Sequence, residues 1–375
     1  MVYLDNAATT RVCPEAAAAA IHYMTEEFGN PSSTHGPGRA ARNALKDARA
    51  VLAASIGAAP GEIYYTAGGS EGDNWAIRSG ARLMRRKGRH IISSATEHDA
   101  VRKSLDELEK DGFEVTRLSP AADGSIHVDD VLAALRKDTV LVSLMLVNNE
   151  TGAVTDIAAI GKALRAAGSE ALLHTDAVQG YLKVPFTVKS LGADMITLSG
   201  HKIHAPKGVG ALYIRNGLRL PPHIVGGGQE DGRRSGTENL PGICAFAAAV
   251  TAAQADKGAM ARMAALRQWA IDALAAEAPE LVVNGGGAPH ILNLSLPGYK
   301  SEVLLNYLDA KEICVSKGSA CKRGARSHVL EAMGLPPKVI DGSLRVSLCR
   351  FTTEEDIDVF CRTLLEARST LYKTL

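Results

Sequence analysis

The sequence predicts an α/β fold, with a mainly parallel sheet in a large domain and a smaller α+β domain beside it. Short apolar runs alternate with longer amphipathic stretches from about residue 60 to residue 215. Most of these runs lack polar alternation, which indicates strands buried on both faces, as in a parallel sheet covered by helices. After about Gly242 the pattern changes to a long Ala-rich stretch followed by scattered strands, which is typical of an α+β unit.

The large domain is expected to repeat a βαβ pattern. Its predicted strands are residues 62–66, 90–94, 115–118, 140–147, 171–175, 195–198 and 210–214. A helix is expected at residues 71–81, after the first strand, and another at 156–167.

In the small domain, the Ala-rich residues 243–278 are expected to form one long helix. Strands are expected near 291–295, 313–316 and 343–347, with a terminal helix from about Thr353. We therefore expect a large domain at residues 13–250, and a small domain built from residues 1–12 and 251–375.

The composition indicates an ordinary soluble protein. Of the 375 residues, 46% are hydrophobic and 22% are charged. The net charge of +1 provides no global field that favours nucleic acid or a membrane surface, so neither is expected as a direct partner. The six cysteines form no CxxC pair and no cluster with zinc spacing, so no metal site is expected. Scattered cysteines and an N-terminus unlike a signal peptide predict a cytoplasmic location.

Polar residues follow the predicted strands, where ligands collect in open α/β sheets. Gly68-Gly69-Ser70 comes after a strand and before a helix, so its backbone N–H groups could bind an oxyanion; an ordinary turn capped by Ser70 is the alternative. Asp176 ends a buried strand and could pair with a pyridinium nitrogen, or be a structural carboxylate. Lys202 ends the next strand and could form a Schiff base with an aldehyde, or be a surface lysine; Lys207 is its rival.

His98 could stack on a flat ring or move protons, and a structural role is equally compatible with the sequence. A second Gly-rich segment, residues 226–229 with 234–237, could wrap an anion or be a flexible connection. Arg345 is a cation in an apolar strand and needs an anionic partner, either a ligand carboxylate or an internal carboxylate.

Cys321 lies in Gly318-Ser319-Ala320-Cys321, a segment rich in small residues that predicts an exposed loop. The cations Lys322, Arg323 and Arg326 follow it and could stabilise a thiolate, so a reactive thiol is favoured. For the other cysteines, packing is the favoured interpretation. The other cysteines are Cys13, Cys244, Cys314, Cys349 and Cys361.

In order and spacing these segments resemble the cysteine desulfurases of the class V aminotransferase group, of the NifS/IscS type. The resemblance runs from Leu4-Asp5-Asn6 to Arg350-Phe351-Thr352, and its most specific parts are Ser199-Gly200-His201-Lys202, Arg234-Ser235-Gly236-Thr237 and the segment ending in Cys321. It implies pyridoxal 5′-phosphate (PLP) as cofactor, the PLP-dependent transferase fold type I, and a homodimer with sites at the subunit interface. The implied reaction converts L-cysteine to L-alanine and leaves the sulfur on an enzyme cysteine as a persulfide.

The resemblance also implies a role for each matching residue. Lys202 is expected to bind the cofactor and move protons, Asp176 to pair with the pyridinium nitrogen, Gln179 with the ring hydroxyl, and His98 to stack on the ring. Asn149 and Arg345 are expected to bind the substrate carboxylate, and Cys321 to receive the sulfur. The expected phosphate ligands are Gly69, Ser70, Ser199, His201 and, from the other subunit, Thr237.

Two segments depart from the family pattern. The phosphate loop reads Ala-Gly-Gly-Ser-Glu where many relatives have Ser-Gly-Ala-Thr-Glu, which keeps the hydroxyl. The loop after Cys321 is short and basic, which leaves open whether the sulfur acceptor is an iron-sulfur scaffold, for iron-sulfur cluster assembly, or a tRNA or cofactor thiolation enzyme. The alternatives in function are another fold type I PLP enzyme (a selenocysteine lyase, a β-eliminating C–S lyase or an aminotransferase) and a non-catalytic scaffold that keeps the fold.

Overall fold

The computed structural model describes residues 1–317 and 326–373. Across these residues the largest sheet has seven strands in the order β2-β8-β7-β6-β5-β3-β4. Strand β8 pairs antiparallel with β2 and β7, and the other pairs are parallel, so the predicted mainly parallel sheet is confirmed. The strands are β2 (Ile63–Thr66), β3 (His90–Ser94), β4 (Glu114–Leu118), β5 (Thr139–Ser143), β6 (Leu172–Asp176), β7 (Met195–Ser199) and β8 (Gly210–Ile214).

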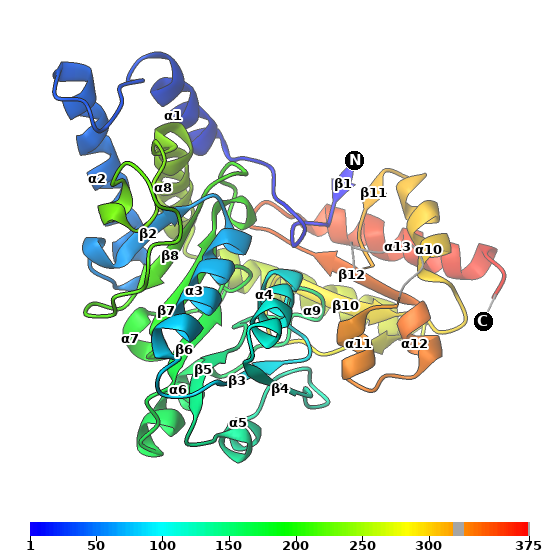
Figure 1. The fold of residues 1–375 in the computed structure, drawn as a ribbon. Helices are drawn as coiled ribbons and strands as arrows, with labels where there is room; N and C mark the ends of the chain where they lie inside the picture. The colour runs from blue at the N-terminus through cyan, green and yellow to red at the C-terminus, as the bar shows by residue number, and fades with distance from the viewer. Residues whose placement is uncertain (318–325, 374–375) are drawn as a thin grey trace.

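Helices cover both faces of this sheet, which is why its strands are apolar without alternation (Figure 1). Neighbouring residues on one strand join different cores: Ile91 packs on the side of α3 and α4, and Ile92 on the side of α2 and α8. The helices of this region are α1 (Pro14–Thr25), α2 (Gly36–Ile56), α3 (Gly69–Met84), α4 (Asp99–Lys110), α5 (Val128–Ala134), α6 (Ile157–Ala166), α7 (Val188–Leu191) and α8 (Leu240–Ala255). Three short 3₁₀-helices span Pro60–Glu62, Gly200–Lys202 and Glu230–Gly232.

Two predicted elements differ from the structure. Residues 144–147 do not extend β5, although Leu144 and Leu146 still donate backbone hydrogen bonds to His174 and Asp176 at the end of β6. The prediction of one helix over residues 243–278 was wrong, because α8 ends at Ala255 and α9 (Ala259–Glu277) begins after a turn. Asp256 has a ψ of 73°, far from the value of an α-helix, so α8 cannot continue through it. Its carboxylate pairs with Arg262 in the first turn of α9.

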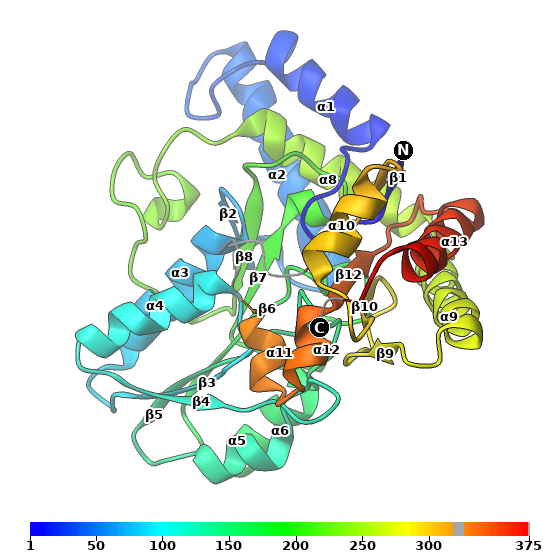
Figure 2. The ribbon, with the colours of Figure 1, turned by 90° about the vertical axis from the view of Figure 1, so that its right-hand side faces the viewer.

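The C-terminal part forms a second layer of helices and strands around its own core. Strands β12 (Ser343–Ser347), β10 (Ile291–Ser295) and β9 (Val282–Val283) form one antiparallel sheet, and β1 (Val2–Tyr3) pairs with β11 (Ile313–Cys314) in another. Helices α9 and α13 lie side by side at its outer edge (Figures 1 and 2). The remaining helices are α10 (Ser301–Asp309), α11 (His328–Ala332), α12 (Pro337–Asp341) and α13 (Glu354–Thr370).

The buried hydrophobic residues form separate clusters in the two parts of the chain. One cluster combines Leu4 with residues between Ala259 and Ala367, whereas Ala7 belongs to a cluster of the large sheet, so the N-terminal segment contacts both cores. The boundaries at residues 12–13 and 250–251 remain a prediction. In the described ranges, no helix is both long enough and apolar enough to cross a membrane.

Candidate active site

All strands of the large sheet except β8 have their carboxyl ends at the same edge. Strands β2 and β7 are both antiparallel to β8, so they run in one direction, and β6, β5 and β3 follow in parallel. The turns that leave this edge carry most of the predicted site residues, as expected for an open α/β sheet. The candidate site is therefore built by the loops after β2, β3, β5, β6 and β7.

Lys202 ends the 3₁₀-helix that follows β7, and its amine points to the N-terminal segment. Nζ donates hydrogen bonds to the carbonyl oxygens of Ala7 at 2.6 Å and Ala8 at 2.7 Å. Burial, followed by the Arg345 cation, lowers the pKa of the Lys202 amine to about 8, against the opposing effects of Asp176 and Asp5. The rival residue Lys207 is exposed on a turn, so Lys202 is the better candidate for amine chemistry.

Asp176 is buried at the end of β6, with 7% of its surface exposed. Its Oδ1 accepts a hydrogen bond from the backbone N–H of Val178 at 2.8 Å. Burial raises the pKa of this carboxyl, while His98, the Val178 N–H and Lys202 each act to lower it. A cation placed against Asp176 would favour its ionised form in the same way.

A polar network lies behind Asp176, and sequence reasoning missed it. His174, also on β6, is fully buried; Nδ1 lies 2.9 Å from Ser143 Oγ and Nε2 lies 3.0 Å from Thr197 Oγ1. Burial lowers the pKa of His174 to about 3, so the imidazole is neutral and its 3.6 Å contact with Asp73 is not an ion pair. Burial, followed by the nearby Asp176, raises the pKa of Asp73. The buried carboxyls of Asp73 and Asp176 thus influence each other, and ionisation of one disfavours ionisation of the other.

The turn before α3 fits the predicted oxyanion site. Helix α3 begins at Gly69, and a Cβ on Gly69 would lie 2.8 Å from Val178 Cγ2, so a larger residue here would require the Val178 side chain to shift. A Cβ on Gly210 would likewise lie 2.7 Å from Gly68 Cα. Ser199 Oγ is buried beside this turn and has no hydrogen-bond partner among the described residues. Ser70 is exposed, at the start of the helix rather than at its N-cap, which is Gly68.

Three further predicted residues lie around the same edge. Gln179 Nε2 donates to the Ala7 carbonyl at 2.8 Å, while its Oε1 is buried without a partner in the described part of the chain. His201 Nδ1 lies 3.2 Å from Thr9 Oγ1, and burial lowers the pKa of His201 to about 4, so it is neutral. His98 is exposed and caps α4, because its Nδ1 accepts from the Ala100 N–H at 3.1 Å. In that arrangement a neutral His98 carries its proton on Nε2.

Arg345, on β12, reaches the site from the small domain. It is only 4% exposed; Nη2 lies 2.8 Å from Asp5 Oδ1, and Nη1 donates to the backbone carbonyl of Asn149 at 2.9 Å. The structure thus shows the internal ion pair that was the alternative interpretation of Arg345. Asp5 was not predicted, although it lies in the Leu4-Asp5-Asn6 segment; its side chain is 23% exposed, so the ion pair reaches the solvent on the Asp5 side.

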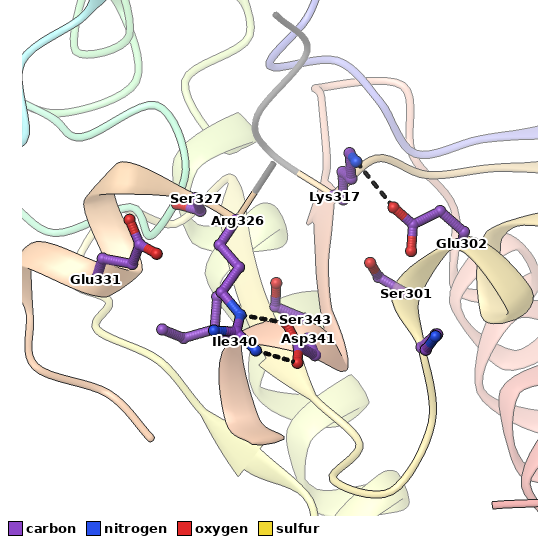
Figure 3. Close-up of a pocket in the computed structure, with 10 residues that line it drawn as sticks. Ser301, Glu302, Lys317, Arg326, Ser327, Glu331, Ile340, Asp341 and Ser343 are labelled. Atoms are coloured by element: carbon purple, nitrogen blue, oxygen red, sulfur yellow. Dashed lines mark hydrogen bonds and ion pairs between the residues drawn. The ribbon is translucent and has the colours of Figure 1, made fainter. Parts of the chain in front are cut away.

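Cys321 lies outside the described residues, as do Lys322 and Arg323. Lys317 and Arg326, on either side of that segment, line a polar cavity of about 560 Å³ (Figure 3). Arg326 forms a two-point ion pair with Asp341 at 2.6 and 2.7 Å, and Lys317 pairs with Glu302 at 3.0 Å. Arg326 therefore has an anionic partner already, which reduces its capacity to stabilise a thiolate.

The remaining cysteines fit packing roles only in part. Cys13, Cys244 and Cys361 are buried, whereas Cys314 and Cys349 are partly exposed. No group of three or more His, Cys, Asp or Glu side chains that could hold a metal occurs in residues 1–317 and 326–373.

Comparisons with known proteins agree with this geometry. Residues 2–360 match the family described as Aminotransferase class-V. The chain is 46% identical over 363 residues to "Cysteine desulfurase 2" of Trichormus variabilis, which covers 96% of this chain and 90% of that protein. Among solved structures, a "NIFS-LIKE PROTEIN" superposes with a TM-score of 0.93 at 35% identity, covering 99% of this chain and 100% of that one. "SspA in complex with cysteine" gives 0.83 at 33% identity, covering 94% and 100%.

Proposed function

Because the chain belongs to the class-V aminotransferase family, we propose that it is a cysteine desulfurase that converts L-cysteine to L-alanine. The observation that carries this proposal is its similarity, over nearly the whole of both chains, to proteins named cysteine desulfurase. The family depends on PLP, so the chain is a PLP-dependent enzyme. These relatives favour desulfuration over the aminotransferase, lyase and scaffold alternatives.

The residues at the strand ends fit PLP. A buried carboxyl at Asp176 suits the ring nitrogen, and an amine with a lowered pKa at Lys202 suits the aldehyde. The unpartnered Ser199 hydroxyl and the glycine turn at the start of α3 suit the phosphate, since helix N-termini bind anions. The side-chain oxygen of Gln179 is buried without a partner among the described residues and could accept a hydrogen bond from the ring hydroxyl.

When bound, PLP supplies an electron sink that stabilises negative charge at the substrate α-carbon. Asp176 holds a proton on the ring nitrogen, and Lys202 accepts the α-proton and later returns one. Arg345, with Asn149, orients the substrate carboxylate. The Cys321 thiolate attacks the substrate sulfur; an S–S bond forms, the substrate C–S bond breaks, and its electron pair stays on the carbon that becomes the alanine methyl group.

The pKa of Lys202 predicts how the ligand-free protein recaptures PLP. Only the neutral amine can attack an aldehyde, so the capture rate should rise by about tenfold between pH 7 and pH 9 and then level off, as expected for a pKa near 8. The measurement is borohydride trapping followed by peptide mapping of the label at each pH. An ordinary lysine would still accelerate at pH 10, and a rate that kept rising there would contradict the lowered pKa.

Arg345→Lys is expected to raise the KM for cysteine and to lower turnover, each by roughly tenfold, because lysine keeps the charge but loses the planar two-point grip. Steady-state kinetics with saturating PLP measure both constants. Lysine also weakens the pairing with Asp5, so Asp5→Asn is the matched control: it should leave Arg345 free for substrate and should not raise KM. Unchanged kinetics in Arg345→Lys would mean that Arg345 serves only the internal ion pair.

We propose a homodimer in which Thr237 reaches the phosphate site of the second copy. Thr237 is exposed, and the structure gives its hydroxyl no hydrogen bond within the described residues. Ile21, Met24 and Phe28 are 58%, 56% and 71% exposed on and just after α1, a set of large apolar side chains that a second copy could cover. The proposal also includes a persulfide on Cys321, a cytoplasmic location and a separate sulfur-acceptor protein, with iron-sulfur cluster assembly as one pathway.

An assay for alanine and sulfide tests the proposed reaction. Purified protein loaded with PLP should release both products from L-cysteine in equal amounts when a thiol reductant is present. L-Selenocysteine should be tested in parallel, because the same site could accept it. Production of pyruvate and ammonia in place of alanine would identify a β-eliminating lyase and would overturn the proposal.

A further inference from the structure

The segment that carries Thr237 is anchored to its own chain by charged side chains. This segment, residues 223–238, is named the 223–238 loop. It is largely exposed, yet Glu230 within it is only 7% exposed and its carboxylate is fully engaged. Sequence reasoning treated the loop as an anion-binding segment or a flexible connection, and it did not single out Glu230.

Glu230 binds three N–H donors on two other elements. Its Oε1 accepts from Arg49 Nη2 at 2.6 Å, and its Oε2 accepts from Arg49 Nη1 at 2.8 Å and from the backbone N–H of Tyr65 at 2.9 Å. Arg49 comes from α2 and lies over the Tyr65 ring, 4.7 Å from its centroid. A two-point pair of this kind fixes orientation as well as distance.

The backbone at this anchor is strained. Glu230 and the next residue, Asp231, have φ values of 49° and 56°, so two consecutive residues other than glycine occupy the left-handed region. Such a conformation costs free energy and persists only where surrounding contacts hold it. The Glu230 carboxylate provides these contacts, so the path of the loop depends on it.

A second charged pair holds the loop closer to Thr237. Arg234 donates to Glu71 Oε1 at 2.8 Å and Oε2 at 3.1 Å, and Glu71 also accepts from the Ala67 N–H at 2.8 Å. Glu71 lies in the first turn of α3, next to the predicted phosphate ligands. The loop is thus fixed at residues 230 and 234, and Thr237 follows three residues later.

We propose that Glu230 is a positioning residue that acts across the subunit interface: through Arg49 it fixes the loop that presents Thr237 to the phosphate site of a second copy of this chain. The inference rests on the homodimer of the proposed function. It adds that a residue controlling part of one site lies in the other chain, in the 223–238 loop and buried against Arg49 of α2. Glu230 is therefore not a catalytic residue, and its loss should weaken cofactor retention without changing the chemistry in the intact site.

Glu230→Gln tests this role with little change in shape. A glutamine has one oxygen for three N–H donors, and its NH₂ group would face at least one of them. The Kd for PLP should rise by roughly tenfold, as for the loss of one charge-assisted hydrogen bond, while the KM for cysteine at saturating PLP stays within about twofold. Asp231→Asn is the matched control: it removes the neighbouring charge, which is exposed, and should leave the Kd for PLP unchanged.

Mixed dimers distinguish action across the interface from a local effect. Two differently tagged chains are co-expressed, the mixed dimer is purified on both tags, and activity is measured near the wild-type Kd for PLP. When Lys202→Ala is on one chain and Glu230→Gln on the other, the intact Lys202 site receives a normal loop, so about half of the wild-type activity should remain. When both changes are on one chain and the other is wild type, the only intact Lys202 site receives the altered loop, so activity should fall to about a fifth of that, as a tenfold rise in Kd gives at this PLP concentration.

The reverse order of activities, with the first mixed dimer weak and the second about half active, would overturn the inference. Arg49→Lys provides a second variant for the same two mixed dimers, because it keeps the charge but loses the two-point contact with Glu230. The activities of its two mixed dimers should rank as they do for Glu230→Gln. If Glu230→Gln does not fold, the Arg49→Lys result decides. A purely structural role would lower thermal stability in both arrangements equally and would not separate them.

Thr237→Ala in the same two arrangements separates the inference from its premise. If Thr237→Ala acts across the interface and Glu230→Gln does not, the inference is wrong and the proposed dimer stands. If Thr237→Ala itself acts within its own chain, then the premise is wrong, and the assignment of Glu230 is overturned with it. Production of alanine from cysteine is measured independently of either outcome.

Discussion

Cys321→Ser is expected to lower alanine formation from L-cysteine by at least about a thousandfold while PLP stays bound. A serine hydroxyl is not ionised at neutral pH, so no strong nucleophile remains to attack the substrate sulfur. The residues assigned to cofactor and substrate binding are unchanged in this variant. Binding of cysteine should therefore still alter the visible absorbance of the protein, although turnover stops.

Mass spectrometry provides the second measurement for Cys321. Wild-type protein treated with cysteine and no reductant should gain about 32 Da, one sulfur atom, on the peptide that contains Cys321. Cys314→Ser is the matched control, because Cys314 is a partly exposed cysteine on β11, and it should keep full activity. If Cys321→Ser still released alanine and sulfide at the wild-type rate, the sulfur would not pass through Cys321 and the persulfide proposal would be wrong.

Lys202→Ala is expected to lower turnover by about three orders of magnitude or more, because the variant loses both the amine that binds the cofactor and the base that moves the α-proton. Borohydride treatment should then leave no PLP on the protein, whereas the wild-type protein should carry the label on Lys202. The structure supports this assignment, since the amine is held by two backbone carbonyls and has a pKa lowered to about 8.

Lys207→Ala is the matched control for Lys202. Lys207 lies five positions further along the chain, is exposed, and should tolerate alanine with no loss of label or activity. A label found on Lys207 in the wild-type protein would show that the wrong lysine was chosen. Partial rescue of Lys202→Ala by a small added amine would support the role in proton transfer, since such an amine can enter the space left by the side chain.

Local sequence patterns were sufficient to predict the sheet and to place the polar turns at one of its edges. Ile91 and Ile92 face different cores, and two adjacent apolar residues of this kind, in place of an apolar–polar alternation, are the signature of a strand buried on both faces. Because the polar turns follow the carboxyl ends of such strands, the sequence alone assigns Gly69, Asp176 and Lys202 to one edge. The roles of individual residues came from the family resemblance, and those roles remain predictions.

The sequence by itself determined the elements, the order of the polar turns and the candidate residues, whereas the tertiary structure decided the partners of the charged side chains. Arg345 pairs with Asp5 across 340 positions, and Arg49 pairs with Glu230 across 181. Periodicity reports which face of a helix or strand is buried, but it carries no information on which of many carboxylates lies opposite a given arginine. That choice follows from how the elements pack. The break between α8 and α9 at Asp256 was likewise not predicted, because the Ala-rich composition favours a helix across it.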